Sequence, residues 1–518
     1  MSIKDAVHDK FKGTYDICII GSGPVGLTLC AELVELAKAG QRICVLESGG
    51  RKKTPEADSL KNVENNGNVL IKQHSRERVF GGTSTAWSGL SAPLDEIDIG
   101  SRPYLSYASS WPISFSELSS YYERAGQYGF PDFRIYSDGL NTIKESGDLI
   151  IQPTSVVEKV FAGANPPWNF ADKFQHIFNQ PNIDIFLNAT VTNIISKKDE
   201  NGQATVIGVR VIGADKKTHT VSAGIFILAV GGIETSRLLL LSRHTCENGL
   251  GNEHDHVGRF IMNHPKNNFG MLRLKKPVRN LPYLFGYENR GVLIYTGFRV
   301  SEVLQRERRI LNSYIRFEPV SPWTENNVVP AFVSLIKRRS KSLVSDIYRV
   351  IRHTPSLISY IMNKVFKKKP AITLVKLRNF MEMEPQAGNR ITLSKIVDTN
   401  GNPVPKVTIN VSDLDKKSLI ELHKVFAEEM LSSGAGTVES SLEEAAPWPI
   451  TADASHHLGG ARMGLDPESS VVDSNLRVHS VNNLYICGGA VFPTSGCANP
   501  TYTMVALAIR LADTLKKR

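Results

Sequence analysis

The chain has 518 residues, of which 41% are hydrophobic and 22% are charged. This balance excludes a largely disordered or collagen-like chain, and the length predicts roughly two to four folding units. No apolar run approaches the roughly 18 residues of a membrane-spanning helix, and the first residues lack the apolar core of an export signal. Six cysteines are too few for a disulfide framework in a chain of this length. We therefore expect a reducing, cytoplasmic compartment.

The net charge of +10 is concentrated in one segment. Residues 337–369 hold ten lysines or arginines and a single acid, Asp346, which leaves 51 basic and 50 acidic residues in the rest of the chain. Apolar residues at helical spacing lie on both sides of Pro355, a residue type that favours the first turn of a helix. The segment is therefore predicted to be a basic amphipathic helical hairpin, of the kind that lies on an anionic membrane surface.

Other interpretations of this segment stay open. Its apolar face could pack on the rest of the protein or form a subunit contact in a homo-oligomer, and its charge could serve another anionic partner. Nucleic acid fits least, because no nucleic-acid-binding motif accompanies the charge. On the membrane interpretation, the protein would be peripheral on the inner face of a membrane.

The first predicted element along the chain is a dinucleotide-binding turn. Residues 15–20 are continuously apolar, as in a buried parallel strand, and a helical pattern runs from 27 to about 38. Between them, Gly21 permits a tight turn, Gly23 lets the backbone approach a pyrophosphate, and Gly26 lets the helix pack closely on the strand. The N-terminus of this helix also supplies positive partial charge for a phosphate.

A second strand, residues 42–46, ends at Glu47. A carboxylate at this place can accept hydrogen bonds from ribose hydroxyls, and it disfavours the 2′-phosphate of NADP. The turn, the helix and the acid together predict binding of FAD or NAD.

The next motif is the loop at residues 78–89, RVFGGTSTAWSG. Paired glycines followed by small hydroxyl residues leave many N–H groups free, so Gly82, Thr83 and Ser84 are suited to wrap the phosphates and ring of a flavin. By itself, such a loop is equally typical of a plain turn.

The remaining elements return to a nucleotide-binding pattern near the end of the chain. Strands are predicted at 183–187, 204–212 and 219–229, followed by a helix that ends at 241. The less regular region 265–450 has predicted strands of a mixed sheet at 309–317 and 390–393 and a helix at 415–431. The last 65 residues contain a predicted strand at 483–487 and a helix at 501–516.

This order predicts an α/β fold with a discontinuous Rossmann-like cofactor domain and an inserted α+β substrate domain that contains a mixed or antiparallel sheet. We place the cofactor domain at residues 1–125, 185–265 and 450–518. The substrate domain then takes residues 126–184 and 266–449, with 337–369 as a helical insertion.

The C-terminal region carries a third motif, SHHLGGARMG at 455–464, followed by GGA at 488–490 and ANPT at 498–501. His456 and His457 are adjacent, so on an extended chain their side chains point in different directions, and at most one is expected to be catalytic. For an isolated pair, a hydrogen-bonded structural role is the commoner case.

Together, and in this order, the three motifs resemble the glucose–methanol–choline (GMC) family of FAD-dependent oxidoreductases. The C-terminal block is most similar to the pyranose-oxidase branch, which has a histidine and an asparagine where many members have two histidines. The resemblance places the catalytic histidine at His456 and its partner at Asn499, and it implies no metal. It implies FAD contacts from Gly21, Gly23, Gly26, Glu47, Gly82, Thr83, Ser84, Val191, Gly489, Ala490, Asn499 and Thr501.

One departure from the pattern concerns how the cofactor is held. In pyranose oxidase, a histidine of the GGxSTxW loop carries the flavin covalently. The matching residue here is Ala86, which has no nucleophilic side chain. We therefore expect non-covalent FAD.

The resemblance implies oxidation of a primary or secondary alcohol, on a sugar, glycoside or glycan, to an aldehyde or ketone. Flavin N5 would take the hydride, His456 would take the hydroxyl proton, and Asn499 would orient the hydroxyl. Alternatives are oxidation of a sterol or aryl alcohol, or a non-redox reaction of the hydroxynitrile-lyase type. The electron acceptor is expected to be oxygen or a quinone, and a membrane location would favour a lipid-linked substrate. His264 is a weaker site candidate, since such a residue more often proves to be a loop histidine.

Overall fold

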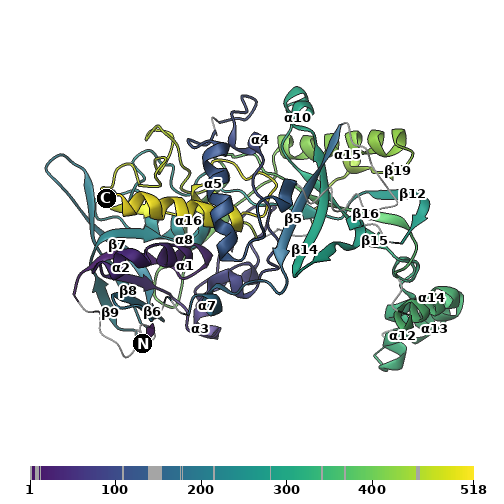
Figure 1. Ribbon diagram of the computed structural model, residues 1–518, viewed down its shortest axis with the longest axis horizontal. Coiled ribbons are helices and arrows are strands. Elements are labelled where there is room, and N and C mark those ends of the chain that lie inside the picture. Colours follow the sequence, from purple (N-terminus) through teal and green to yellow (C-terminus); the bar gives the residue numbers. More distant parts are fainter. Residues whose placement is uncertain are drawn as a thin grey trace.

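The computed structural model describes residues 3–5, 11, 13–107, 110–137, 155–175, 177, 179–213, 216–279, 282–339, 342–366, 369–450 and 455–518. Two halves lie along the long axis of the molecule (Figure 1). One half contains both termini and a parallel sheet, and the other contains an antiparallel sheet with a group of helices at its far end. This arrangement confirms the predicted α/β Rossmann-like unit with a second unit built on a different sheet.

The first half is built on six parallel strands in the order β1–β6–β3–β2–β10–β20. The central strand β2 carries the first apolar run, and its inward positions are buried as expected inside a parallel sheet. The strands come from widely separated parts of the chain: β1 (Ile3–Asp5), β2 (Tyr15–Ile20), β3 (Ile43–Leu46), β6 (Ile183–Leu187), β10 (Ala223–Leu228) and β20 (Leu484–Ile486).

Helices follow the strands of this sheet. They are α1 (Pro24–Glu32) after β2, α8 (Gly231–Leu241) after β10, and α16 (Thr501–Lys516) near the C-terminus. The single helix predicted for 27–38 is in fact two, because Leu33 leaves the helical conformation (φ −90°, ψ 4°) between α1 and α2 (Val34–Lys38).

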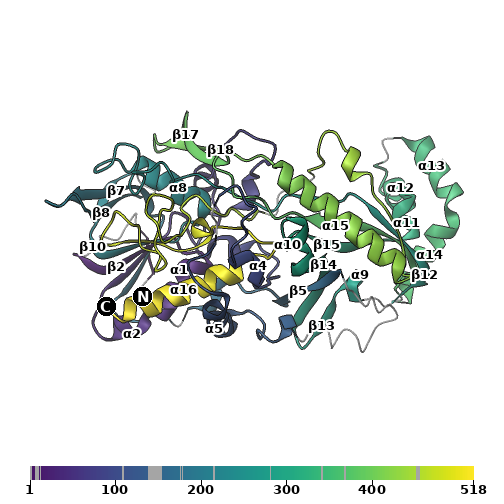
Figure 2. The same cartoon turned by 90° about the horizontal axis from the view of Figure 1, so that it is seen from above.

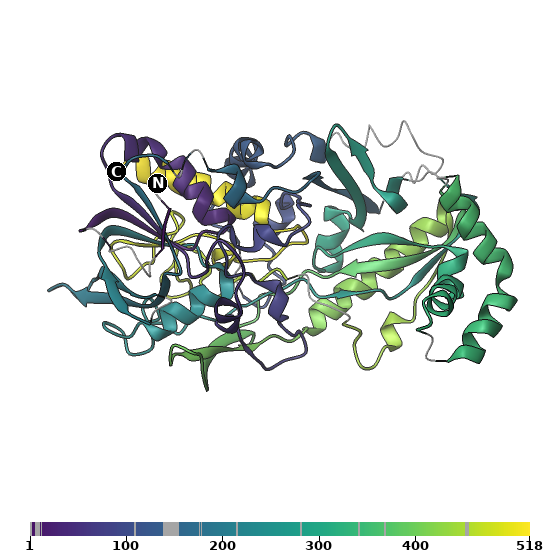
Figure 3. The same ribbon diagram turned by 90° about the horizontal axis from the view of Figure 1, so that it is seen from below.

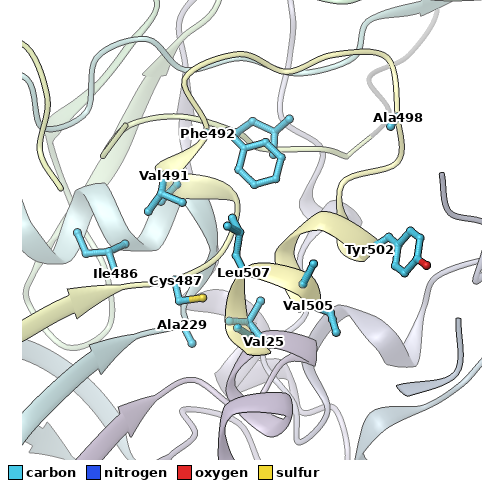
Figure 4. Packing of buried hydrophobic residues seen from close by; sticks show 14 of the residues in the cluster. Val25, Ala229, Ile486, Cys487, Val491, Phe492, Ala498, Tyr502, Val505 and Leu507 are labelled. Atoms are coloured by element: carbon cyan, nitrogen blue, oxygen red, sulfur yellow. The ribbon is translucent and has the colours of Figure 1, made fainter. Parts of the chain in front are cut away.

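Hydrophobic packing joins the C-terminal segment to the first strand–helix unit. Figure 4 shows side chains of β20, the turn after it and α16 gathered near Ala229, which follows β10, and Val25, at the start of α1. The residues labelled there are all buried: Val25, Ala229, Ile486, Cys487, Val491, Phe492, Ala498, Tyr502, Val505 and Leu507. The two ends of the chain therefore form one core.

A small antiparallel sheet of β7 (Thr190–Lys198), β8 (Ala204–Ile212) and β9 (Thr218–Val221) belongs to the same half. The strand predicted for 219–229 is divided, because β9 pairs antiparallel with β8 while β10 joins the parallel sheet.

The second half contains an eight-stranded antiparallel sheet, ordered β13–β14–β15–β16–β12–β19, with β5 on β14 and β11 on β16. Helix α15 (Asp413–Ser432) lies along this sheet (Figure 2) and begins with a capping box formed by Ser412 and Asp415. The strands are β5 (Val156–Ala164), β11 (Lys266–Asn267), β12 (Met271–Val278), β13 (Tyr287–Asn289), β14 (Val292–Val300), β15 (Tyr314–Val320), β16 (Ile372–Phe380) and β19 (Gly436–Glu439).

Two predicted strands of this region are wrong in detail. The strand expected at 309–317 is β15, which begins only at Tyr314, because helix α10 (Glu302–Arg308) and a left-handed Arg309 come first. The strand expected at 390–393 is β17 (Arg390–Val397), which belongs to a separate three-stranded sheet with β18 (Pro403–Thr408) and β4 (Glu64–Asn65).

Other helices of the described chain are short: α3 (Pro55–Ser59), α4 (Glu96–Ile99), α5 (Phe115–Ala125), α7 (Phe170–Lys173) and α9 (Pro282–Phe285).

Between β15 and β16 the chain forms a helical insertion, which we define as residues 322–366. It comprises α11 (Pro322–Glu325), α12 (Val328–Ile336), α13 (Leu343–Arg352) and α14 (Thr354–Val365). The helices α13 and α14 match the predicted hairpin, although residues 340, 341, 367 and 368 of that prediction lie outside the described residues, as do 138–154 of the predicted substrate domain. The insertion lies at the end of the molecule opposite the two termini (Figures 1 and 3). Across the described ranges, no helix is both long and apolar enough to span a bilayer.

A buried ion pair ties the two halves together. Arg102, which follows α4, makes two hydrogen bonds of 2.8 and 2.7 Å with Glu382, just after β16, and both side chains are fully buried. The Glu382 carboxylate also accepts hydrogen bonds from the backbone N–H groups of Asn312 and Gly496. Nearby, burial and the charges of Asp95 and Glu382 raise the pKa of Asp98 to about 7. This carboxylate network fixes the chain around Gly496 relative to the antiparallel sheet.

The substitution Arg102→Met should lower the free energy of unfolding by about 3–5 kcal/mol, because it leaves the Glu382 carboxylate buried without its counter-ion. Chemical denaturation followed by circular dichroism measures the change. The control is Arg134→Met, which breaks a solvent-exposed pair with Asp132 and should cost less than about 1 kcal/mol. Equal losses in the two variants would contradict the structural role of the buried pair.

Candidate active site

One cavity of about 480 Å³ runs from the first strand–helix turn to the C-terminal histidines. Most residues singled out by the sequence line it, although they come from distant parts of the chain. The lining includes Gly23, Glu47, Gly82, Thr83, Ser84, Val191, His456, Gly489, Asn499 and Thr501. Three expected cofactor residues, Gly21, Gly26 and Ala490, do not line it.

Gly21 and Gly26 shape the turn instead of facing the cavity. A Cβ on Gly26 would lie 1.9 Å from the Gly21 carbonyl oxygen, so only glycine lets α1 pack this closely on the strand. Gly21 has a φ of +102°, which favours glycine, and a Cβ there would meet the Ala229 carbonyl oxygen at 2.6 Å. Ala490 is buried, and its carbonyl accepts a hydrogen bond from Ala461, which holds the C-terminal motif against the turn after β20.

Gly23 differs from these two glycines because open space lies in front of it. A Cβ on Gly23 would have no atom within 4 Å, and the residue lines the cavity at the N-terminus of α1. No side chain caps this helix end, so its first N–H groups and its positive partial charge are available to an anionic ligand.

Glu47 is held rigidly at the end of β3. Its Oε2 accepts hydrogen bonds from the Ser22 N–H at 3.1 Å and the Ser22 hydroxyl at 2.6 Å, and its Oε1 accepts one from the Gly49 N–H at 2.7 Å. Burial raises the pKa of Glu47, while these hydrogen bonds act in the opposite direction. The carboxylate is thereby fixed at the cavity wall.

The loop with the paired glycines packs directly on the first turn. A Cβ on Gly82 would lie 2.8 Å from the Gly23 Cα, so the two glycine motifs are in close apposition. Ser84 stabilises the loop by donating to the Gly81 carbonyl at 2.6 Å and accepting from the Phe170 N–H at 3.2 Å. The loop is therefore part of the cavity wall and not an isolated turn.

His456 lines the other end of the cavity, and the buried His264, which does not line it, faces the His456 ring. Their Nδ1 atoms are 2.8 Å apart. The cause is a backbone register: Met262 and Leu458 exchange two hydrogen bonds, of 2.8 and 3.0 Å, in an antiparallel bridge. In that register, His264, two residues after Met262, lies opposite His456, two residues before Leu458. The side chain of Asn263 fixes the same geometry, because its Oδ1 accepts from the N–H groups of both histidines.

Burial makes both rings neutral near neutral pH. Desolvation lowers the pKa of His456 well below 6.5, and the nearby His264, Lys266 and His457 lower it further. Desolvation also lowers the pKa of His264 to about 4, although the backbone of Ser495 and Gly496 partly opposes this change. A neutral imidazole has one N–H group and one lone pair, so one Nδ1 must donate to the other.

Asn499 lines the cavity with His456 and donates its amide nitrogen to the Leu90 carbonyl at 2.7 Å. The bond orients the amide, and Nδ2 retains a second hydrogen that can donate to a ligand. His457 also lines the cavity. Thr501 begins α16, so the N-terminus of that helix faces the same space.

Comparisons with known proteins show what the chain is similar to. A protein-family model described as GMC oxidoreductase matches residues 385–508. The fructose dehydrogenase large subunit of Gluconobacter japonicus is 27% identical over 324 residues, which cover 62% of this chain and 52% of that protein. The 2-methyl-1,2-propanediol dehydrogenase of Mycolicibacterium austroafricanum is 24% identical over 97% of this chain and 95% of that protein. Pyranose 2-oxidase of Emericella nidulans is 31% identical over 29% of this chain and 26% of that protein.

The C-terminal part of the chain thus matches the GMC oxidoreductase family, and the two longer similarities, to dehydrogenases, are distant. The match spans about half the length of the fructose dehydrogenase large subunit. Solved structures agree on the fold. Pyridoxine 4-oxidase from Mesorbium loti aligns with a TM-score of 0.52 over 98% of this chain and all of that chain, at 15% identity. A formate oxidase from Aspergillus oryzae RIB40 aligns with a TM-score of 0.55 over 98% and 99% of the two chains, at 17% identity.

GMC oxidoreductases act on CH–OH groups as oxidases or dehydrogenases, and the family implies FAD. The cavity fits this cofactor in its chemistry. The open space at Gly23 and the uncapped end of α1 suit a pyrophosphate, and the fixed carboxylate of Glu47 suits a ribose.

His264 is the residue that the sequence undervalued. Its motif, Asn-His-Pro, gives no signal of pairing, and His264 lies 192 positions from His456. Only the register between Met262 and Leu458 reveals the pair, and no local pattern in the sequence predicts that register.

Gly23→Ala tests the assignment of the phosphate site. The new methyl group would enter open space, so the unfolding temperature of the FAD-free protein should not change, whereas the affinity for FAD should fall at least tenfold, or about 1.4 kcal/mol. Flavin titration by fluorescence measures the affinity. The control is Gly126→Ala, which is equally unhindered but lies outside the cavity lining and should bind FAD normally. Normal FAD affinity in Gly23→Ala would contradict the assignment.

Proposed function

We propose that this GMC oxidoreductase oxidises a primary or secondary alcohol of a sugar, glycoside or glycan to an aldehyde or ketone. The observation that carries the proposal is the half-buried, desolvated His456, which lines the same cavity as Asn499, the glycine motifs and Glu47. The sugar assignment draws on relatives whose names concern carbohydrates, among them fructose dehydrogenase, pyranose 2-oxidase and C-glycoside 3-oxidase.

His456 acts as the general base in this proposal. Bound FAD would supply the hydride acceptor for the carbon that is oxidised. The hydroxyl proton passes to Nε2 of His456, which requires that Nε2 carries a lone pair and Nδ1 carries the hydrogen. The free amide hydrogen of Asn499 donates to the same hydroxyl oxygen and orients it.

His264 is a positioning residue for this base. If Nδ1 of His456 carries hydrogen, it donates to Nδ1 of His264, and His264 must accept. The contact therefore couples the tautomers of the two rings, and the arrangement in which His264 accepts leaves a lone pair at Nε2 of His456. This is the orienting role that a third group commonly has in acid–base pairs.

We also propose that FAD is held without a covalent bond. Ala86 lines the cavity and offers no nucleophile. Cys487 lines it too, but burial raises the pKa of its thiol, which keeps it protonated and unreactive.

The proposed domain division needs one adjustment. The parallel sheet comes from residues 1–125, 185–265 and 450–518, and the antiparallel sheet comes from residues 126–184 and 266–449. The exception is β6, which begins at Ile183, so we place that boundary before Ile183.

The electron acceptor, oxygen or a quinone, and a homo-oligomeric state stay predictions.

A second candidate is the oxidation of a small non-sugar alcohol, which the similarity to 2-methyl-1,2-propanediol dehydrogenase over 97% of the chain favours. An anaerobic panel of sugars, glycosides, diols, sterols and aryl alcohols separates the candidates by which compounds bleach the bound flavin. Oxygen and quinones added afterwards identify the acceptor. Turnover without bleaching would contradict redox chemistry and favour a lyase reaction.

His456→Ala should retain FAD but reduce it at least ~100-fold more slowly with the best alcohol of the panel, because the variant lacks the base for the hydroxyl proton. Rapid mixing under anaerobic conditions measures the rate. His457→Ala is the matched control and should lose far less. A near-normal rate in His456→Ala would assign the base to His457 instead.

His264→Leu should slow flavin reduction at least ~10-fold, because His456 loses the acceptor for its Nδ1 hydrogen. His264→Asn should recover most of the rate, since its Oδ1 can replace the accepting Nδ1. If His264 were only structural, the two variants should reduce flavin at the same rate when their thermal stabilities are equal. That result would remove His264 from the mechanism.

A further inference from the structure

The helical insertion exposes far more apolar surface than any other part of the described chain. Of the twenty large hydrophobic side chains that are exposed in the described residues, twelve lie within residues 333–366. A folded soluble surface rarely gathers large apolar side chains in this way unless they meet a partner.

Helix α13 is oriented with its apolar face outward. None of its residues is buried, and its polar side packs inward, where Asp346 accepts a hydrogen bond of 2.7 Å from Ser334 of α12. The five outward residues, Leu343, Val344, Ile347, Tyr348 and Ile351, lie on one side of the helix and are between 43% and 81% exposed. An amphipathic helix normally buries this face, so α13 lacks a covering layer within the described chain.

Helix α14 repeats the arrangement. It packs on α11 and α12 through Leu357, its one buried residue, while its amide Asn363 turns back to Ser359. The adjoining side of the helix exposes Ile358, Ile361, Met362, Val365 and, in the following turn, Phe366. The insertion therefore presents apolar faces on two successive helices, at the end of the molecule farthest from the termini (Figures 1 and 3).

Positive charge surrounds these faces. Lys337, Arg338 and Arg339 are exposed at the end of α12, Arg352 at the end of α13, and Lys364 near the end of α14. The one acid of the segment, Asp346, is engaged with Ser334 and Arg349. Exposed apolar side chains bordered by lysine and arginine are the composition of helices that lie in the interface of an anionic bilayer.

We propose that the helical insertion docks this enzyme on an anionic lipid surface, with the apolar faces of α13 and α14 entering the interface and the basic residues meeting lipid phosphates. In the described chain these apolar faces do not pack on the rest of the protein, because their side chains are exposed. A second copy of the chain fits poorly, because it would bring two segments with ten basic residues and one acid each into contact.

The docking proposal does not depend on which alcohol is oxidised. If docking holds, a substrate or electron acceptor that resides in the membrane becomes accessible to the enzyme. Failure of the docking test leaves the oxidation chemistry untouched, and failure of the alcohol panel leaves the docking intact.

The test is co-sedimentation of the flavin-loaded full chain with vesicles of phosphatidylcholine alone and with added phosphatidylglycerol. We expect binding to the anionic vesicles, weaker binding to the neutral ones, and a loss of binding at high salt. The paired substitutions Val344→Glu and Ile351→Glu, at side chains that are 81% and 70% exposed, should reduce binding at least tenfold.

The matched control pair is Val303→Glu and Leu465→Glu, at side chains that are 77% and 78% exposed elsewhere on the molecule. It introduces the same charge and should leave binding unchanged, and flavin content verifies that both pairs fold. Three results would overturn the proposal: no binding to anionic vesicles, equal losses in the two pairs, or a dimer in solution that the Val344→Glu and Ile351→Glu pair dissociates.

Discussion

Desolvation of the His456 imidazole is the constraint on which the proposed chemistry depends. In water a histidine is partly protonated near neutral pH, but desolvation lowers the pKa of His456 and of His264 so that both rings are neutral. Two neutral rings with facing Nδ1 atoms share a single hydrogen between them, so the tautomer of one ring determines that of the other. When His264 is the acceptor, His456 presents a lone pair toward the cavity, as the proposed base requires.

The fold maintains this contact by joining parts of the chain that are far apart. The bridge between Met262 and Leu458 places the two histidines opposite each other, and Asn263 binds the backbone of both. The same C-terminal region continues into β20 and α16, which pack on the first strand–helix unit, and Gly496 is tied to the antiparallel sheet through Glu382. The base, the glycine motifs and the substrate side are therefore held in one frame.

The sequence predicted the fold class and most of the cavity, because those features depend on local patterns. An apolar strand followed by glycines at fixed spacing has few structural alternatives, so Gly23 and Glu47 were found without a structure. Features set by long-range register were not predictable. Examples are the start of β15 at Tyr314, the separate sheet of β17, and the pairing of His264. The apolar spacing within residues 337–369 predicted helices, but it left open whether their apolar faces would point outward or pack on the protein.

The pH dependence of kcat/KM, measured with the best alcohol of the panel, tests the central claim most directly, because it reports the pKa of the base in the free enzyme. A base must be neutral to accept a proton, so lowering its pKa extends activity toward acid. The account predicts that kcat/KM stays constant as the pH falls through about 6.5 and declines only at distinctly lower pH. A decline centred near pH 6.5, the value of a solvated histidine, would contradict a desolvated His456 as the base.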